Sequence, residues 1–227
     1  MKRRRTVAMA KPGTRSATPV ALTAMFARGL ANLHLDISAE GQAALLHYIA
    51  LLNKWNRVYN LTAVVSQRDM VTRHLLDSLA AAPYVQGPRV LDVGSGPGLP
   101  GIPLAVALPG LHFTLLDSVA KKTRFIIQAV GELGLANVEV ETRRLETYQP
   151  AELFDTVISR AFSAIGPFIT VAGRLCRPGG RLLAMKGRDP AEESAGLPDE
   201  FRVENTRRLR VPGLDEERHL VCLRRQG

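Results

Sequence analysis

The sequence predicts an α/β fold in which helices cover both faces of a mainly parallel β-sheet, preceded by a small helical part. From residue 89 onward, short apolar segments alternate with segments of helical periodicity, and glycine or Pro-Gly turns separate them. Strands that alternate with helices in this way build right-handed βαβ units, whose strands lie parallel. The last two apolar segments, 201–210 and 218–224, alternate as the strands of an antiparallel hairpin do.

The elements of the sheet domain are expected in a regular order. Hydrophobic periodicity and turn residues predict strands at 89–93, 112–117, 137–142, 154–159 and 180–186, and helices at about 101–108, 120–134 and 165–175.

Two helices are expected before the sheet. Residues 38–57 repeat apolar side chains at three- and four-residue steps, and Ser38 is placed to cap their N-terminus. A second helix is expected to begin at Ser66, because Ser66 and Asp69 have the spacing of a capping box.

The N-terminal tail is strongly basic. Residues 1–35 contain seven Lys and Arg residues and no acidic residue, so the rest of the chain carries only +2 of the net charge of +9. Such a tail either contacts nucleic acid phosphates or stays solvated, and its charge alone does not decide between the two. Residues 1–20 lack periodicity and are expected to be disordered. The chain therefore divides into this tail, a helical part over 21–87 and a sheet domain over 88–227.

Composition excludes several classes of protein. The hydrophobic content of 46% supports a real core, but no apolar run approaches the roughly 20 residues of a membrane span. Cys176 and Cys222 lack the spacing of a metal or redox motif, and no metal site is expected. We therefore expect a cytoplasmic protein that does not contact a membrane. The sequence does not determine the oligomeric state, and a monomer is our working expectation.

The most informative stretch joins the first expected strand to its helix. Strand 89–93 runs directly into Gly94, Gly96 and Gly98. Glycines at such a turn let the backbone approach a ligand closely. At the carboxyl ends of parallel strands, turns of this kind hold nucleotides and nucleotide-like cofactors.

Two cofactors are compatible with this glycine loop. Counted from Gly96 through Gly101, the spacing is the G-x-G-x-x-G of dinucleotide-binding proteins, which favours an NAD-dependent oxidoreductase. Counted from Gly94, the loop starts directly after the strand, and the acidic Asp92 suits a ligand with an ammonium group rather than a pyrophosphate. S-adenosylmethionine has such a group. Asp117, at the end of the next strand, can accept bonds from its ribose hydroxyls. The alternative role of Asp92 and Asp117 is to cap the helices that follow them.

A longer set of motifs is more specific than the loop. The segments are NLT at 60–62, RHLLDS at 73–78, DVGSGPGLPGIP at 92–103, LDS at 116–118, KK at 121–122, ISRAF at 158–162 and KG at 186–187. In this order and spacing they resemble the family of ribosomal small-subunit rRNA guanine-N7 methyltransferases, once called glucose-inhibited division protein B. The resemblance covers about residues 36–190.

The resemblance implies a Rossmann-like class I methyltransferase with a seven-stranded sheet. It implies methylation of N7 of one guanosine in a decoding-region loop of 16S rRNA, with S-adenosylmethionine converted to S-adenosylhomocysteine. The family's cofactor contacts correspond to Gly94, Leu99, Leu145, Glu146 and Arg160 of this chain, with Asp117 in the ribose position. The implied partner is 16S rRNA in the small ribosomal subunit or its precursor.

The expected chemistry needs no general base. Guanine N7 has a lone pair and no proton, so catalysis is mainly positioning, for which Arg144, Arg160 and Lys186 are the candidates at the strand ends. A cation aimed at N7 would compete for its lone pair, so we expect these side chains to hold phosphates, O6 or the cofactor carboxylate. Their alternative role is to be solvated charges at strand ends.

Other residues are candidates for RNA contact or for structure. Asn60 has the position of a helix C-cap or a base contact, and Lys121 and Lys122 open a helix where a phosphate contact or a solvated face is expected. His74 and Asp77 are expected to form a buried hydrogen-bonded pair, or else a wall of the substrate entrance. Two alternatives to the rRNA enzyme remain within the same fold: a small-molecule methyltransferase and a non-enzymatic RNA-binding relative.

Overall fold

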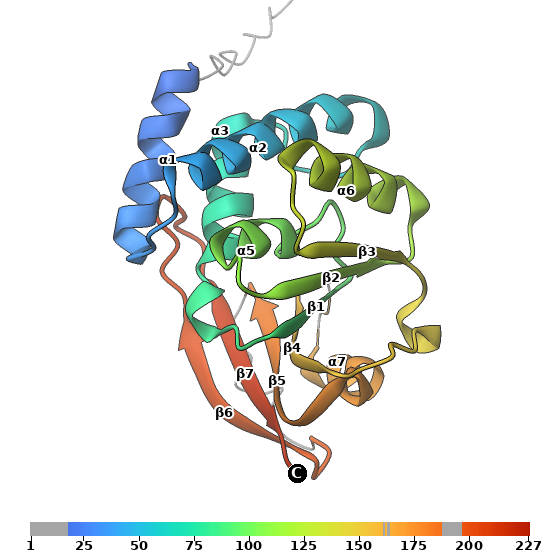
Figure 1. Cartoon of the computed structure of the whole chain (residues 1–227). Helices are drawn as coiled ribbons and strands as arrows, with labels where there is room; N and C mark the ends of the chain where they lie inside the picture. Colours follow the sequence, from blue (N-terminus) through green and yellow to red (C-terminus); the bar gives the residue numbers. More distant parts are fainter. Residues whose placement is uncertain (1–17, 161, 163, 188–196) are drawn as a thin grey trace, which may run out of the picture.

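A single seven-stranded sheet organises the chain. The computed structural model describes residues 18–160, 162, 164–187 and 197–227. Its strand order is β3-β2-β1-β4-β5-β7-β6, and pairs are parallel from β3 through β5 and antiparallel at β5–β7 and β6–β7 (Figure 1). The strands are β1 Arg89–Val93, β2 His112–Asp117, β3 Val138–Thr142, β4 Phe154–Ser159, β5 Cys176–Lys186, β6 Phe201–Arg208 and β7 His219–Arg225. The predicted sheet and C-terminal hairpin are confirmed, although β5 begins at Cys176 rather than at residue 180.

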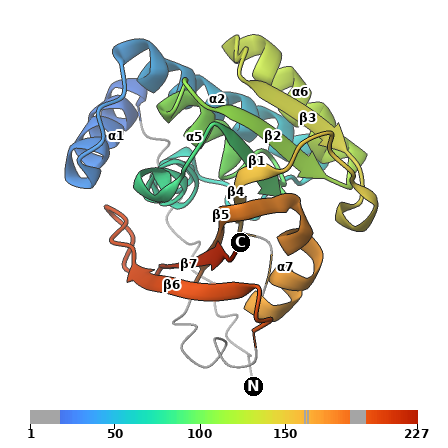
Figure 2. The same cartoon turned by 60° about the horizontal axis from the view of Figure 1, so that its bottom comes forward.

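Helices cover both faces of the sheet, as predicted. Alternation along β1 sends Val90 into one hydrophobic cluster and Leu91 into another. The first cluster lies under α5 (Gly101–Ala107) and α6 (Ala120–Leu133). The second lies under α7 (Ile165–Ala172), which Figure 2 shows on the other side of the sheet. Short 3₁₀ turns occupy η2 Ala82–Tyr84, η3 Leu145–Thr147 and η4 Gly173–Leu175.

The N-terminal helices follow the predicted caps. Ser38 Oγ accepts the N–H of Gly41 at 3.1 Å at the start of α2 (Ala39–Tyr59). Ser66 Oγ accepts the N–H of Asp69 at 3.4 Å, where a continuous helical segment begins. This segment runs through α3 (Gln67–Met70), the π-helix η1 (Val71–Leu76) and α4 (Asp77–Leu79).

One helix was not predicted as a separate element. Helix α1 (Pro19–Leu33) is capped by Thr18 and begins with proline at its first position, where the missing N–H costs nothing. It starts inside the tail that was expected to be disordered through residue 20, so that boundary was too late. The expectation for residues 1–17 lies outside the described residues.

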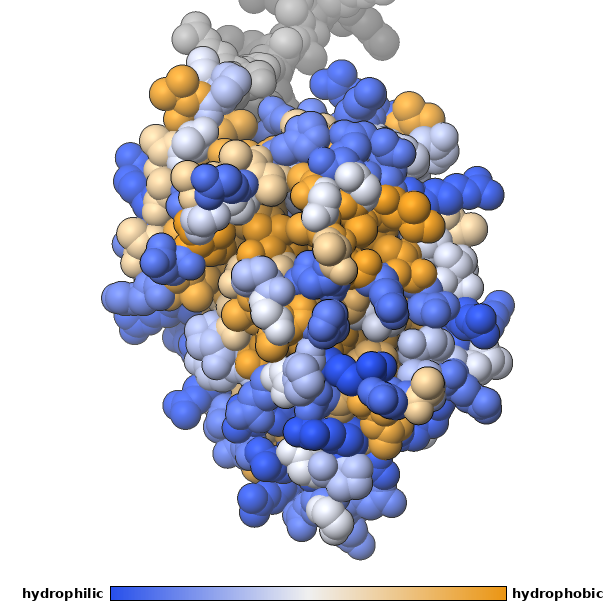
Figure 3. Space-filling view, in the orientation of Figure 1, coloured by the Kyte–Doolittle hydropathy of each residue, from blue (hydrophilic) through white to orange (hydrophobic). Residues whose placement is uncertain are grey.

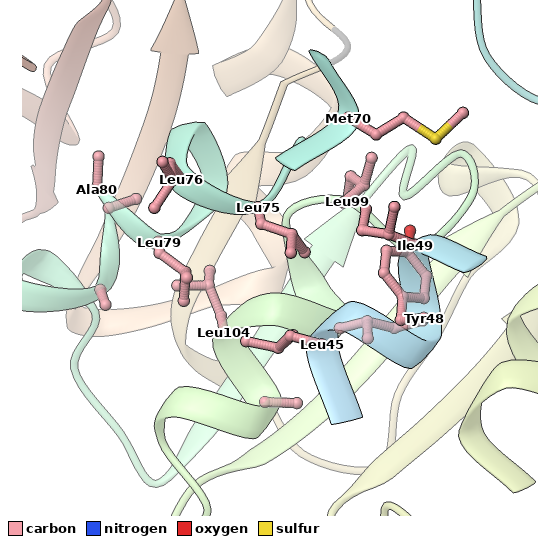
Figure 4. Packing of buried hydrophobic residues seen from close by; sticks show 14 of the residues in the cluster. Leu45, Tyr48, Ile49, Met70, Leu75, Leu76, Leu79, Ala80, Leu99 and Leu104 are labelled. Carbon is pink, nitrogen blue, oxygen red and sulfur yellow. The ribbon is translucent and has the colours of Figure 1, made fainter. Parts of the chain in front are cut away.

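The helical part and the sheet share one core. Leu45, Tyr48 and Ile49 of α2 pack in one cluster with Leu75, and with Leu104 of α5 (Figure 4). The Tyr48 hydroxyl also donates to the carbonyl of Pro97 in the glycine loop at 2.8 Å. The N-terminal helices therefore support the loop that is expected to bind the cofactor.

The surface is mixed in character. In the view of Figure 3, apolar side chains gather among the helices, whereas the end that carries the β6–β7 hairpin is mainly hydrophilic. Across the described residues, no helix has both the length and the hydropathy of a membrane span.

Candidate functional site

The loop after β1 requires glycine at all three alternate positions. Gly94, Gly96 and Gly98 have φ of 70°, 60° and 95°, a region that L side chains rarely adopt. The N–H groups of Gly94 and Ser95 donate to the carbonyl of Leu116 at 2.8 and 3.1 Å. The loop is thus fixed to the carboxyl end of the neighbouring strand β2.

Asp117 joins this loop to the next helix. Its Oδ2 accepts the N–H of Gly96 at 2.9 Å, its Oδ1 accepts the N–H of Val119 at 2.8 Å, and the Lys122 ammonium lies 3.6 Å from Oδ2. Each carboxylate oxygen has a second lone pair, so Asp117 can also accept bonds from two neighbouring hydroxyl groups. The capping role and the ligand role are therefore compatible.

A cavity of about 340 Å³ lies at the ends of β1, β2 and β3. We call it the first cavity, and it brings together five predicted site residues: Gly94, Asp117, Arg144, Leu145 and Glu146. Its other lining residues include Lys122 and Phe162, which belong to the KK and ISRAF motifs, and Val119, Arg143 and Val171, which no motif indicated. Of these, only Lys122 was a candidate, and as an RNA contact.

Arg174 holds the far wall of the first cavity in place. Its Nη2 donates to the carbonyls of Leu145, the first residue of η3, and of Tyr148, which follows η3, at 2.7 and 2.8 Å. The sequence offered no signal for this role, because Arg174 follows Leu145 by 29 positions.

Three other predicted cofactor contacts, Asp92, Gly98 and Leu99, are not among the residues that line the first cavity. Asp92 is fully buried, its Oδ2 accepts the N–H of Gly101 at 2.8 Å, and burial raises its pKa to about 7. Leu99 points into the core (Figure 4), and a Cβ on Gly98 would lie 2.6 Å from Ile102 Cδ1. Asp92 therefore has the capping role that was its alternative, and its expected ammonium contact stays a prediction, as do the cofactor contacts of Leu99 and Gly98.

The position of Asp92 also weighs against a dinucleotide. In that interpretation, the N-terminus of α5 would bind a pyrophosphate. The Asp92 carboxylate already occupies the Gly101 N–H, and a second anion there would be repelled.

A second cavity of about 320 Å³ lies on the other side of the β1–β4 pair. Its lining includes His74, Asp77, Arg160, Lys186 and Arg218. Arg160 was predicted to contact the cofactor, but it lines this second cavity and not the first. Arg144 is separated from Arg160 and Lys186 in the same way, because β3 and β5 end on opposite sides of β1 and β4.

His74 and Asp77 do not bond to each other. His74 Nε2 lies 2.9 Å from Thr62 Oγ1, whereas Asp77 forms ion pairs of 3.2 Å with Arg160 and with Arg218. The π-helix η1 ends directly before Asp77 and changes the angular offset expected for an α-helix. The predicted pair is therefore wrong, but both residues line the second cavity, as the alternative role required.

Burial makes His74 a neutral residue. Its pKa falls from 6.5 to about 4, first because of desolvation and then because of the Arg160 charge. The unfolded chain thus binds a proton at a higher pH than the folded chain. The stability gained from neutral His74 is present above about pH 6.5 and is lost as the pH falls toward 4.

The variant His74→Gln should remove this acid-dependent loss. We expect the unfolding free energy lost between pH 7 and pH 4.5 to be about 2 kcal/mol smaller in this variant than in the parent chain. Urea unfolding at the two pH values measures it. Asp92 gives stability a pH dependence of the opposite sign, but it does so equally in both proteins and cancels in the comparison. An equal loss of unfolding free energy in the two proteins would contradict the assignment of His74 as a buried neutral residue.

Two of the candidate RNA contacts have structural partners. Asn60 is the C-cap of α2 with φ of 50°, a conformation that asparagine tolerates well. Lys121 Nζ donates to the carbonyl of Tyr59 at 3.0 Å, near the negative end of the α2 dipole. This bond explains a lysine at the N-terminus of α6, where a cation is otherwise disfavoured.

A third cavity, of about 340 Å³, lies away from the strand ends. Its charged side chains balance, with Arg28, Arg68 and Arg73 facing Asp69, Asp215 and Glu216. Neither its place nor its charge indicates a cofactor.

Comparisons with known proteins agree with this geometry. Residues 41–221 match the GidB family model, described as rRNA small subunit methyltransferase G. A protein of that name from Nitrosococcus oceani is 51% identical over 197 residues, which cover 87% of this chain and 92% of the relative. One from Laribacter hongkongensis is 53% identical over 195 residues, which cover 86% of this chain and 94% of the relative.

Solved structures show the same fold at low sequence identity. The O-methyltransferase TomG from Streptomyces achromogenes, solved with SAM, has a TM-score of 0.53 at 19% identity and covers 79% of this chain and 90% of its own. The N-methyltransferase NodS from Bradyrhizobium japonicum, solved with S-adenosylhomocysteine, has a TM-score of 0.52 at 17% identity and covers 79% of this chain and 98% of its own. The fold is that of class I methyltransferases. The family match and the relatives together establish that this chain belongs to the rRNA small subunit methyltransferase G family.

Proposed function

We propose that this chain transfers a methyl group from S-adenosylmethionine to N7 of one guanosine in a decoding-region loop of 16S rRNA. The observation that carries the proposal is that Gly94 of the glycine loop and Asp117 line one cavity, beside a second, cationic cavity at the same edge of the sheet. The substrate is the small ribosomal subunit or its precursor, and the enzyme therefore works in the cytoplasm. A monomer suffices, because one chain lines both cavities.

The first cavity fits S-adenosylmethionine. Asp117 has free lone pairs for the ribose hydroxyls, and Gly94 lets the backbone approach the ligand. Leu145 and Phe162 offer apolar walls to the adenine, with Glu146 beside them. Arg144 and Lys122 supply positive charge for the cofactor carboxylate or an RNA phosphate.

The reaction is a displacement in which the chain's residues act by positioning. When bound, S-adenosylmethionine supplies a methyl carbon to the N7 lone pair, and the electron pair of the broken C–S bond returns to sulfur. The positive charge passes to the guanine ring and no proton leaves, so no general base is required. Alignment of the reacting groups supplies on the order of 7–11 kcal/mol. Neutral His74 does not add a cation near N7.

RNA contacts outside the cavities are assigned to exposed polar residues. Asn60 is exposed at the end of α2, beside Lys121, and Arg144 is exposed at the rim of the first cavity. Lys186 is buried in the wall of the second cavity, so it acts on the bound nucleotide rather than on distant phosphates.

The variant Asp117→Asn should bind S-adenosylhomocysteine about 10- to 100-fold more weakly, because charge-assisted hydrogen bonds contribute about 1.5–3 kcal/mol. Calorimetry measures the affinity. Asp155→Asn is the matched control: Asp155 is also buried and accepts a backbone N–H, from Arg89 at 2.8 Å, but lies at the amino end of the sheet. Equal losses in the two variants would contradict the ribose role.

The reaction is tested with small ribosomal subunits from a strain that lacks this enzyme. Incubation with labelled S-adenosylmethionine should place the label on N7 of a single guanosine of 16S rRNA. Label on another atom, or label only on small molecules of the extract, would contradict the proposal. Binding of RNA without any transfer would identify a non-enzymatic relative.

A further inference from the structure

An exposed aromatic ring lies where α2 ends beside the start of α6. The two helices pack against each other in opposite directions (Figure 1). Lys121, near the start of α6, donates to the carbonyl of Tyr59, the last residue of α2, and Glu132, near the end of α6, lies 3.2 Å from His47. Tyr59 is 44% exposed. A single exposed ring is common on protein surfaces, so its surroundings must decide whether it has a ligand.

A stack of aromatic rings holds Tyr59 from the core outward. Its ring centroid lies 5.2 Å from that of Trp55, which lies 5.6 Å from that of Phe125, which in turn lies 5.9 Å from that of Tyr48. Tyr48 and Phe125 are fully buried, and the Tyr48 hydroxyl is bonded to Pro97 of the glycine loop. The Tyr59 ring is therefore fixed on the side of Trp55 and open to solvent elsewhere. A ring that is already ordered loses little conformational entropy when a ligand stacks on it.

The charge around this ring is of one sign. Residues 41–68 and 118–131 contain six Lys and Arg residues and no acidic residue. Lys121 and Arg124 are exposed and lie three positions apart, which makes them neighbours on one face of α6. In the part of the chain that the structure describes, neither forms an ion pair with an acidic side chain. Lys121 uses one of its three N–H groups on the Tyr59 carbonyl, so the others can bind an anion.

This ring and these charges lie at the rim of the first cavity. Lys122, directly after Lys121, lines that cavity and lies 3.6 Å from the Asp117 carboxylate. An RNA that presents a guanosine to a methyl donor in the first cavity must place neighbouring nucleotides near this rim. The ring and the two exposed cations are therefore within reach of the substrate outside the site of reaction.

We propose that Tyr59 stacks on an unpaired base of the rRNA that flanks the target guanosine, and that Lys121 and Arg124 bind the adjoining phosphates. We call these three residues the α2–α6 surface. The inference rests on the proposed function and deepens it, because it names where the flanking RNA binds. Single-stranded RNA binds to aromatic rings beside cations, whereas lysine is depleted at interfaces with proteins. Stacking accepts any base, so the surface contributes affinity rather than sequence specificity.

The chain contains its own probe for this surface. Trp55, which packs against Tyr59, is the only tryptophan of the sequence. A short single-stranded oligoadenylate contains no tryptophan, so any change of tryptophan fluorescence on its addition reports on Trp55. We expect a saturable change in the parent chain without any cofactor, which makes this a readout independent of turnover.

Substitutions of Tyr59 separate stacking from charge. Tyr59→Leu keeps the net charge and an apolar cover over Trp55, but it should weaken oligoadenylate binding by about 5- to 100-fold, the effect of losing one base–aromatic stack. Tyr59→Phe keeps a ring and should recover most of the affinity. Tyr84→Leu is the matched control, because Tyr84 is also partly exposed but lies in η2, ahead of β1 at the amino end of the sheet. It should keep the parent affinity.

A charge-matched pair tests the phosphate contacts. Arg124→Gln should lower the slope of log K against log salt concentration by about 0.7, the value for one phosphate contact with a single strand. Arg202→Gln makes the same change in net charge on β6, where Arg202 is exposed and faces Arg224 at the amino end of the sheet. This control should leave the slope as it is in the parent chain.

The same variants are then compared on small ribosomal subunits. Tyr59→Leu and Arg124→Gln should raise KM with little change in kcat, because they alter binding of RNA away from the reacting atoms. Tyr59→Leu should bind S-adenosylhomocysteine as the parent does, which also shows that it is folded. Parent-like oligoadenylate affinity in Tyr59→Leu, or an equal salt slope in Arg124→Gln and Arg202→Gln, would overturn the inference. Failure of the parent chain to methylate small subunits at all would instead overturn the proposed function.

Discussion

The variant Gly96→Val should lose S-adenosylhomocysteine binding by at least 100-fold. Gly96 has φ of 60°, and a Cβ built there meets no protein atom within 4 Å. The added side chain would therefore project into open space beside Asp117, which accepts the Gly96 N–H. That space is where the loop must approach its ligand, so the expected loss comes from exclusion of the cofactor.

A second glycine provides the control for backbone strain. Gly134, the C-cap of α6, has φ of 64° and is equally free of neighbours within 4 Å. Gly134→Val should cost a similar amount of stability, about 1–2 kcal/mol, yet bind S-adenosylhomocysteine normally. Calorimetry and thermal unfolding of both variants separate the two effects. Normal cofactor affinity in Gly96→Val would show that the loop does not hold the cofactor.

The variant Arg160→Lys should reduce kcat/KM for small-subunit methylation by about 10- to 100-fold, because an ammonium lacks the planar fork of a guanidinium. Lysine keeps a charge beside Asp77 but cannot both hold that carboxylate and present further donors in a fixed direction. Lysine is the informative substitution here, because Arg160→Ala would also leave buried Asp77 with one of its two arginines and destabilise the fold.

Arg225→Lys is the matched control for this change. Arg225 is 22% exposed, and its Nη1 donates to the carbonyl of Cys176 at the opposite end of the sheet. Steady-state kinetics and melting temperatures of the two variants should show similar stability and very different turnover. Similar turnover in both variants would assign Arg160 a structural role only.

The fold could be predicted because its signals are local. Strand and helix alternation, the caps Ser38 and Ser66, and the turn glycines each act within a few residues, and the structure confirms them. Helix α1 was missed because weak periodicity and an adjoining basic tail obscured it, and its stability comes from Phe26 and Leu30 packing in the shared core.

The candidate site was predicted only in part, because strand ends define an edge but not the position along it. Asp117 and Leu145, both predicted to contact the cofactor, line one cavity, since β2 and β3 are adjacent. Arg160 lines the second cavity, because the side that it faces depends on its ion pair with Asp77, 83 positions away, and its contact with the cofactor stays a prediction. The sequence left both roles of Asp92 open, because it does not reveal that one oxygen of the carboxylate accepts the Gly101 N–H.

A crystal structure with S-adenosylhomocysteine tests the central claim most directly. We predict that the ribose hydroxyls bind Asp117, that the adenine lies between Leu145 and Phe162, and that the sulfur faces the second cavity beside Arg160. Electron density for the ligand in another cavity, with the turn formed by Gly94, Gly96 and Gly98 free of ligand, would contradict this account.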